Sequence, residues 1–324
     1  MRYLLPTLLL SQLASTVCAF PDLTERAACT PTPTPGALNV TNATLYYETV
    51  SCGRGPVVLL ISGANGDAFI WEPMASYLAQ NYTVALYDRR GFSRSNITGT
   101  QDYAHRLATD ADDAAALIKH LAKGGPAYAL GTSSGAAVAL ELLLRHSDIF
   151  TGLVSHEVPA LRILPDAANL TAGQLDIYNT YVKYGTYDAL LEFAVFYAAG
   201  ASTSKILGGL GSPTAYSKGN VNYWFDREVV PYPLHNWSIP AIAQHKNKLL
   251  LANGNASNPA GMEVRSNKVI GQALGLPVNL LPGDHVGYTE YPAAFASALP
   301  SREFWSGYEW APELDEKAKL FATG

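Results

Sequence analysis

Apolar runs and stretches of helical spacing alternate along most of the chain. The runs "PVVLLIS", "YTVALYD", "AYALGT" and "GLVSHEV" are largely apolar, as in strands that are buried on both faces. Between them, "RLATDADDAAALIKHLAK" and "GAAVALELLLRH" repeat apolar residues at helical spacing. Buried strands that alternate with helices predict an α/β fold, with a mostly parallel sheet flanked by helices.

Two regions depart from this alternation. The segment from "ALNV" to "TLYYETVSC" alternates apolar and polar residues, which predicts an edge hairpin. Residues 160–240 are rich in Tyr, Phe and Gly, lack a clear strand and include a long stretch of helical periodicity. The strand–helix pattern resumes with "NKLLLANG" and "PVNLLPGDH". We therefore expect a core of residues 37–159 and 241–324, interrupted by a helical cap insertion at 160–240.

The N-terminus has the pattern of a signal peptide. Arg2 supplies a positive charge, "LLPTLLL" an apolar segment, and "VCA" small residues before a cleavage point at Ala19. Residues 20–36, with "CTPTPTPG", form a Pro/Thr-rich leader for which alternate prolines favour an extended conformation. We expect residues 1–19 to be removed and the mature chain to enter the secretory pathway or be secreted.

Charge and composition narrow the class of partner. The 324 residues carry a formal net charge of −5, and Lys and Arg form no runs, which argues against nucleic-acid binding and electrostatic membrane attachment. No segment after the signal peptide is long and apolar enough to predict a membrane span. We see no metal-binding constellation and no phosphate cradle, so we expect no cofactor and no metal; the oligomeric state is left open.

Cysteines and glycosylation motifs agree with secretion. Once Cys18 leaves with the signal peptide, Cys29 and Cys52 remain as a pair that could form one disulfide. The chain also carries seven Asn-x-Ser/Thr motifs, the acceptor pattern for N-glycosylation. They begin at Asn39, Asn42, Asn81, Asn96, Asn169, Asn236 and Asn255.

The stretch "GTSSG" lies between a predicted strand and a predicted helix. It fits the pattern G-x-S-x-G, in which a tight turn lifts the central serine above the carboxyl edge of the sheet. Ser133 is then the candidate nucleophile, and the backbone N–H of Ser134 would stabilise an oxyanion at the start of the helix. Any small-residue turn could show this pattern, so the assignment of Ser133 as nucleophile depends on the other motifs and on a histidine and a carboxylate elsewhere in the chain.

Together with two earlier motifs, "GTSSG" makes the chain resemble an α/β-hydrolase over roughly residues 45–310, because the three motifs follow the family's order along the chain. "ISGANGD" stands where the family has a loop that donates the second oxyanion N–H; we assign that donor to Ala64, with Asn65 as the alternative. "DRRGFSRS" is similar to a structural turn of the family, so Asp88 and Arg90 are expected to be scaffold. Ser62 replaces the family's usual His, and Ser93 replaces a glycine.

The resemblance also implies a histidine base and a carboxylate. His285 in "PGDHVGY" follows the last predicted strand, where its ring would reach Ser133. The usual acid loop, "LANGNASNPAGMEV", contains no Asp. We therefore choose Glu157, at the end of the preceding strand, to orient His285, with Glu263 and Asp284 as alternatives. Glu157 could instead be a salt-bridge or capping residue.

These residues predict a secreted serine hydrolase that cleaves carboxylic esters or lactones through an acyl-enzyme. The aromatic side chains of the cap either pack it onto the core or line a pocket for a small apolar or aromatic substrate. Two other interpretations stay open. One is a tailoring enzyme of secondary metabolism that uses the same site for cyclisation or acyl transfer. The other is a non-catalytic receptor or binding module.

Overall fold

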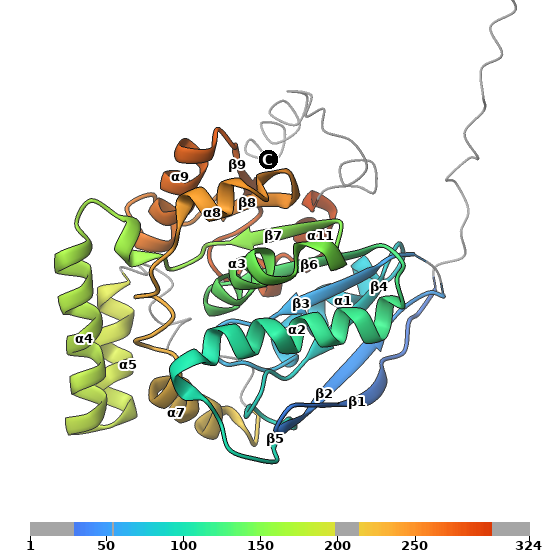
Figure 1. The fold of residues 1–324 in the computed structure, drawn as a ribbon, viewed down its shortest axis with the longest axis horizontal. Coiled ribbons are helices and arrows are strands. Elements are labelled where there is room, and N and C mark those ends of the chain that lie inside the picture. The colour runs from blue at the N-terminus through green and yellow to red at the C-terminus, as the bar shows by residue number, and fades with distance from the viewer. Residues whose placement is uncertain (1–28, 54, 198–213, 300–324) are drawn as a thin grey trace, which may run out of the picture.

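One mixed sheet organises the molecule. A computed structural model describes residues 29–53, 55–197 and 214–299, so the predicted signal peptide at 1–19 and much of the leader lie outside the described residues. Neighbouring strands follow the order β1-β2-β4-β3-β6-β7-β8-β9, and β5 pairs with β2 (Figure 1). The strands are β1 (Thr34–Val40), β2 (Ala43–Val50), β3 (Val57–Ile61), β4 (Thr83–Tyr87), β5 (Asn96–Ile97), β6 (Ala127–Thr132), β7 (Gly152–His156), β8 (Leu249–Gly254) and β9 (Val278–Leu281).

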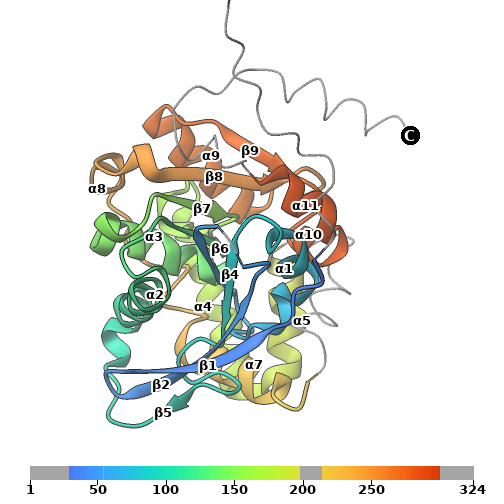
Figure 2. The same cartoon turned by 90° about the vertical axis from the view of Figure 1, so that its right-hand side faces the viewer.

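Strands β4, β3, β6, β7, β8 and β9 run parallel to their neighbours in that order, whereas β2 pairs antiparallel with β1, β4 and β5 at one edge. Figure 2 shows β1 and β2 at the bottom of the sheet and β8 and β9 at the top. The predicted edge hairpin is β1–β2, joined by a two-residue turn. It begins earlier than expected, because residues 34–36, assigned to the leader from their prolines, pair with Tyr47, Glu48 and Thr49. An outermost strand tolerates Pro35, since it need not donate on both sides.

Helices cover both faces of the sheet, as the alternating pattern predicts. Side chains of α2, α3, α8 and α9 share one apolar core with the sheet, and those of α1, α10 and α11 share a second core on the opposite face. Strands β3, β6 and β7 are buried at every position, which explains their unbroken apolar sequence. These helices are α1 (Glu72–Leu78), α2 (Arg106–Ala122), α3 (Ser134–His146), α8 (Ile239–Ala243), α9 (Met262–Leu274), α10 (Gly287–Glu290) and α11 (Pro292–Ala298).

Between β7 and β8, the described residues form three further helices, α4 (Ala167–Tyr184), α5 (Thr186–Phe196) and α7 (Ser217–Arg227). In Figure 1, α4 and α5 lie side by side at the left of the molecule. Their apolar side chains form a third core with Phe92 and Met262 of the main domain, and Ala64 packs against it. Part of the predicted cap, residues 198–213, lies outside the described residues.

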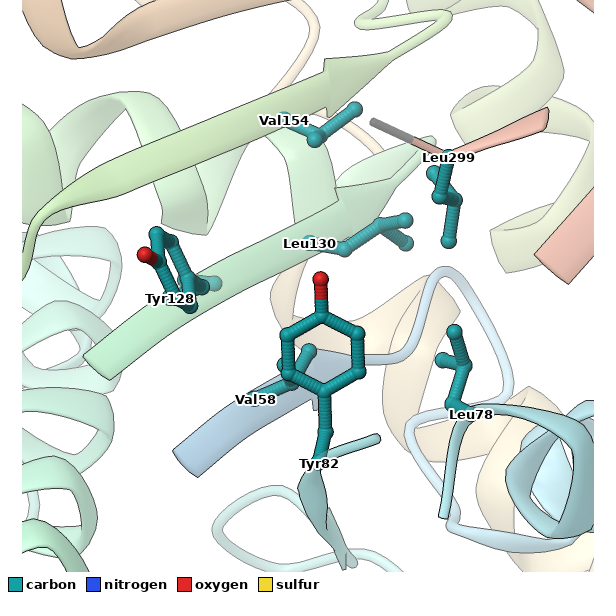
Figure 3. A pocket seen from close by; sticks show the side chains of 8 residues that line it. Val58, Leu78, Tyr82, Tyr128, Leu130, Val154 and Leu299 are labelled. Atoms are coloured by element: carbon teal, nitrogen blue, oxygen red, sulfur yellow. The ribbon is translucent and has the colours of Figure 1, made fainter. Parts of the chain in front are cut away.

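An apolar pocket lies on the face of the sheet that α1 covers (Figure 3). Strand residues Val58, Leu130 and Val154 line it together with Leu78 and Leu299. None of the predicted site residues lines this pocket, so it is a packing feature of the second core.

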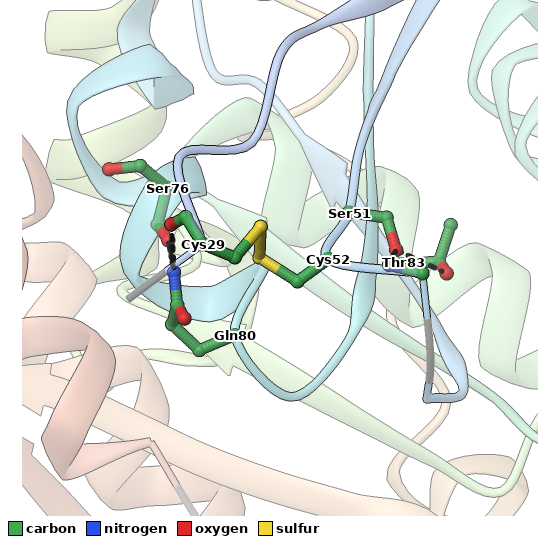
Figure 4. The surroundings of a disulfide bond; sticks show 7 residues. Cys29, Ser51, Cys52, Ser76, Gln80 and Thr83 are labelled. Carbon is green, nitrogen blue, oxygen red and sulfur yellow. Dashed lines mark hydrogen bonds between the residues drawn. A yellow bond between two sulfur atoms is a disulfide. The ribbon is translucent and has the colours of Figure 1, made fainter. Parts of the chain in front are cut away.

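The disulfide between Cys29 and Cys52 is present, with their Cα atoms 5.9 Å apart (Figure 4). It joins the start of the described chain to the end of β2. The Cys52 N–H donates to Ala79 O over 3.1 Å, and Gln80 Nε2 donates to Cys29 O over 3.1 Å, so both cysteines contact the segment after α1.

The predicted glycosylation motifs and the lengths of the helices can both be examined in the structure. The asparagines of all seven glycosylation motifs are exposed. Within residues 29–53, 55–197 and 214–299, no helix is long and apolar enough to cross a membrane.

Candidate active site

Ser133 occupies the turn between β6 and α3, in an unusual backbone conformation. Its φ is 54° and its ψ −126°, a region that residues with a side chain rarely adopt. The flanking glycines make the turn possible. A Cβ on Gly131 would lie 2.2 Å from Gly135 O, and a Cβ on Gly135 would lie 2.2 Å from Ile61 O. The turn therefore presents the Ser133 side chain at the carboxyl edge of the sheet.

The loop after β3 lies directly against this turn. A Cβ on Gly63 would be 3.0 Å from Ser133 Cβ and 3.7 Å from Ser133 Oγ, so any larger residue would crowd the serine. Among the hydrogen bonds of the described ranges, none uses the N–H of Ala64 or of Ser134. The alternative donor is the backbone N–H of Asn65. The side chain of this residue is buried and donates to Asp67 Oδ2 over 2.5 Å. The predicted donors thus flank the serine and have no acceptor among the residues that the structure describes.

His285 and Glu157 form a direct pair. His285 Nδ1 lies 2.6 Å from Glu157 Oε2, and the Glu157 side chain is fully buried. Because an ionised carboxylate only accepts, Nδ1 carries the hydrogen and Nε2 faces away from Glu157. The other carboxylate oxygen, Oε1, accepts from the N–H of Gly254 over 2.8 Å. Glu157 follows β7 with φ 49°, a second strained position at the same sheet edge.

The charges of this pair are strongly perturbed. Burial raises the pKa of Glu157, but the hydrogen bond from His285 and the influence of His156 lower it more, to about 2. Burial lowers the pKa of His285, yet the hydrogen bond and charge of Glu157, with help from Glu263 and Asp284, raise it to about 9. Each partner therefore stabilises the charged form of the other.

His156 connects the two halves of the site and was not anticipated from the sequence. Its carbonyl accepts from the Ser133 N–H over 3.0 Å, and its ring stacks on that of His285 with 6.2 Å between centroids. Thr132 Oγ1 lies 2.9 Å from His156 Nδ1. Burial lowers the pKa of His156 to about 4, so the ring is neutral at neutral pH. No hydrogen bond joins Ser133 Oγ to His285 among the described residues, but His156 contacts both residues, Ser133 through its carbonyl and His285 through its ring.

The two alternative acids lie nearby. Burial raises the pKa of Glu263 to about 7, and its Oε2 is buried without a hydrogen-bond partner. Asp284 Oδ1 accepts from the Val286 N–H over 3.1 Å, within the turn that carries His285. Both carboxylates influence His285 through charge, whereas Glu157 bonds its ring directly.

Of the described residues, Glu157, Glu263 and His285 each bring one oxygen or nitrogen within 4.8 Å of the others, a spacing that could hold a metal ion. The Nδ1 of His285 and one oxygen of Glu157 already bond to each other. A cation bound through those two atoms would have to displace that hydrogen bond.

The second motif has the scaffold contacts expected of it. Asp88 Oδ1 accepts from the Ala68 N–H, and Arg90 forms a two-pronged ion pair with Asp113 of α2. Ser93, which stands where the family has glycine, keeps a positive φ of 44°. Arg89, which lies between them, was not predicted to have a role. Its side chain is fully buried and pairs with Asp110 and Glu228, both distant in sequence.

Comparisons with known proteins agree with the fold. A family model described as "alpha/beta hydrolase fold" matches residues 56–256, more than half of the chain. An uncharacterized hydrolase of Bacillus subtilis, YraK, is 30% identical over 268 residues, which cover 82% of this chain and 94% of that protein.

Solved structures share the fold at low sequence identity. The enol-lactonase from Burkholderia xenovorans superposes with a TM-score of 0.62 at 18% identity, covering 84% of this chain and 100% of its own. A thermophilic esterase from Thermogutta terrifontis gives a TM-score of 0.61 at 20% identity, covering 85% and 98%. From the family model and the YraK relationship, the chain belongs to the alpha/beta hydrolase fold family and is an enzyme of that family.

Proposed function

We propose that this hydrolase cleaves carboxylic esters or lactones through an acyl-enzyme on Ser133. The observation that carries the proposal is the His285–Glu157 pair, in which Nδ1 lies 2.6 Å from a buried carboxylate, at the same sheet edge as a serine on a strained turn. A base oriented by a third group beside an activated hydroxyl is the arrangement that nucleophilic acyl transfer needs.

In the proposed first step, Ser133 Oγ attacks the carbonyl carbon and its proton moves to His285 Nε2. The carbonyl oxygen becomes an oxyanion and accepts from the N–H groups of Ala64 and Ser134. When the tetrahedral intermediate collapses, the bond to the leaving oxygen breaks and His285 protonates that oxygen. Water, deprotonated by the same ring, then attacks the acyl carbon. The bond to Ser133 Oγ breaks, Oγ takes the proton back from His285, and the carboxylic acid leaves.

The electrostatics of the site support this sequence of proton transfers. The pKa of Glu157 at about 2 keeps its carboxylate ionised at any pH where the enzyme would work. The buried negative charge of Glu157, which bonds Nδ1, stabilises the imidazolium that forms when Nε2 takes the serine proton. Once His285 has lost its second ring proton, the same charge holds the neutral ring in the tautomer that exposes a basic Nε2.

Cap and neighbours support an apolar ester or lactone as substrate. Ala64, one proposed oxyanion donor, packs against the apolar cluster of the cap, which includes Tyr178, Phe193 and Trp224. A carbonyl bound at Ala64 would therefore have apolar and aromatic side chains beside it. Two neighbours in fold are named an enol-lactonase and an esterase, which agrees with this substrate class.

We further propose that the enzyme is exported. The disulfide and the exposure of all seven motif asparagines support export, because disulfides persist and N-glycans are added along the secretory route. Export would place the chain in an oxidising compartment, where the Cys29–Cys52 bond contributes to its stability.

A fluorophosphonate probe tests the nucleophile directly, since it phosphonylates only an activated serine. The parent protein is expected to be labelled, with mass mapping placing the adduct on Ser133 and not on Ser134. Ser133→Ala is expected to abolish labelling, while Ser297→Ala, a control at an exposed position on α11, leaves it intact. Undiminished labelling of folded Ser133→Ala would refute the proposed mechanism.

A further inference from the structure

Arg89 joins three parts of the molecule that are far apart in sequence. Its guanidinium is fully buried after β4. Nη1 donates to Asp110 Oδ2 of α2 over 2.9 Å, and both Nη atoms donate to the Glu228 carboxylate, over 2.8 and 2.7 Å. Nη2 also donates to Gly63 O over 2.8 Å. One side chain thus contacts the core helix α2, the end of cap helix α7 and the loop beside Ser133.

The contact with Gly63 bears on the oxyanion donor. The carbonyl of Gly63 and the N–H of Ala64 belong to one planar trans peptide group, so they point in opposite directions. Holding the Gly63 oxygen therefore fixes where the Ala64 N–H points. The positive guanidinium on that oxygen also polarises the peptide and makes its N–H a stronger donor.

The backbone of Arg89 holds the same loop from its other end. The Arg89 N–H donates to Gly66 O over 2.6 Å, and the Gly66 N–H donates to Gly63 O over 2.9 Å. The segment 63–66 is thus closed on itself and fastened to Arg89 through both side chain and backbone. Such a loop keeps its donor in place before the reaction, which is what oxyanion stabilisation requires.

The cap contacts this assembly at both ends of α7. At one end, Glu228 accepts from Arg89 and also from Arg106 Nη2 over 3.1 Å. At the other end, Asn220 Nδ2 donates to Asp67 Oδ2 over 3.2 Å, and its Oδ1 accepts from the Ser93 N–H over 2.9 Å. Of the two carboxylates that orient Arg89, Asp110 belongs to the core and Glu228 to the cap, and α7 contacts the loop that holds Ala64 through Asn220.

We infer that Arg89 is a positioning residue of the oxyanion hole, acting through the Gly63 carbonyl, and that Glu228 makes this position depend on how the cap lies on the core. The inference rests on the proposed acyl-enzyme mechanism. It assigns the Arg89–Glu228 pair a part in transition-state stabilisation, beyond holding the cap in place.

The neighbouring Arg90 provides a matched control. It is also a buried arginine in the same motif, with a two-pronged ion pair to Asp113 at 2.6 and 2.8 Å. Its remaining contacts are with Thr41 O and Gln101 Oε1, on the side of the antiparallel strands. Replacing it removes a buried fork of the same kind without touching Gly63 or the cap.

The test compares Arg89→Lys with Arg90→Lys by the kinetics of fluorophosphonate labelling at Ser133. Lysine keeps the charge but cannot bridge Gly63 and both oxygens of Glu228 at once. Loss of a whole oxyanion donor slows catalysis about 10²–10³-fold, so a displaced donor should slow phosphonylation of Arg89→Lys roughly 10- to 100-fold. The maximal labelling rate should fall while the probe's half-saturating concentration stays, and Arg90→Lys should match the parent.

Equal rates for folded Arg89→Lys and parent would overturn the inference, as would an equal loss in Arg90→Lys. If Arg89→Lys does not fold, Glu228→Gln reports from the cap side and should slow labelling by a smaller factor; a parental rate in that folded variant overturns the inference. A parent that is not labelled at all refutes the proposed function itself, so the two failures are distinguishable.

Discussion

At the scale of single residues, His285 is surrounded by more negative charge than its catalytic pair requires. Glu157 bonds its ring, and an oxygen of Glu263 lies within 4.8 Å of the pair with no hydrogen-bond partner for its buried Oε2. The raised pKa of His285, about 9, means that the free enzyme holds an imidazolium at neutral pH. A protonated Nε2 cannot accept the serine proton.

We therefore expect kcat/KM for an ester to rise with pH until His285 loses its proton near pH 9. Glu263→Gln removes a charge that favours the imidazolium, so the midpoint of its pH profile should lie at lower pH than in the parent. Each pH unit by which the midpoint falls should raise kcat/KM at pH 7 about tenfold. Glu290→Gln, an equal charge change at an exposed site on α10, should keep the parental midpoint. Identical pH profiles for Glu263→Gln and parent would contradict this account.

How far single residues are predictable depends on whether their role is local. Ser133 and His285 stand in short motifs beside strands, so sequence alone nominates them. Glu157 required an argument from chain order, because the loop that usually carries the acid contains no Asp. His156 and Arg89 could not be found this way, since the first lies next to its partners only in the folded sheet and the second contacts Gly63, Asp110 and Glu228 across the chain.

At the scale of elements, the parallel strands and their covering helices are predictable because burial on both faces leaves an unbroken apolar run. The start of β1 was misjudged, because prolines suggest an extended leader whether or not the segment pairs with a neighbour. How the cap helices sit on the core was also beyond sequence, since polar contacts such as Asn220 with Asp67 fix it.

The nucleophile turn makes an element-scale prediction. Gly135→Ala would place a methyl group 2.2 Å from Ile61 O and 2.5 Å from Ser62 O, so the end of β3 must move. We expect a loss of at least about 1–3 kcal/mol in the free energy of unfolding, together with slower probe labelling, because the loop after β3 carries Ala64. Denaturant titrations measure the first effect.

Gly219 in α7 is the matched control for that substitution. Apart from the backbone of its own helix, no heavy atom of the described residues lies within 4 Å of a Cβ added there. Gly219→Ala should therefore stabilise the protein by about 0.4–1 kcal/mol, since alanine lowers the entropy of the unfolded chain. If the two variants shift the unfolding midpoint in the same direction, steric closure of the turn is not what excludes a side chain at Gly135.

At the scale of the whole molecule, one covalent bond closes the N-terminal edge of the fold. The disulfide spans 23 residues and encloses the β1–β2 hairpin. β1 is the outermost strand and most of its residues are exposed or half-buried, so apolar burial contributes little to holding it. The bond instead limits the conformations of the unfolded chain, an effect that does not depend on how well β1 packs.

Loss of this bond should lower the free energy of unfolding by about 3 kcal/mol, as expected for a closed loop of this length. That is a large share of the roughly 5–15 kcal/mol typical of a folded domain, so a chain kept reduced should unfold at clearly lower denaturant than the oxidised one. Guanidinium titrations with and without a thiol reductant measure the difference. A Cys29→Ala/Cys52→Ala variant should have the same unfolding midpoint as the reduced parent, and that midpoint should not change when the reductant is added. If reduction leaves the parent's midpoint unchanged, the bond contributes nothing to stability, and the argument that this chain is suited to an oxidising compartment loses its main structural support.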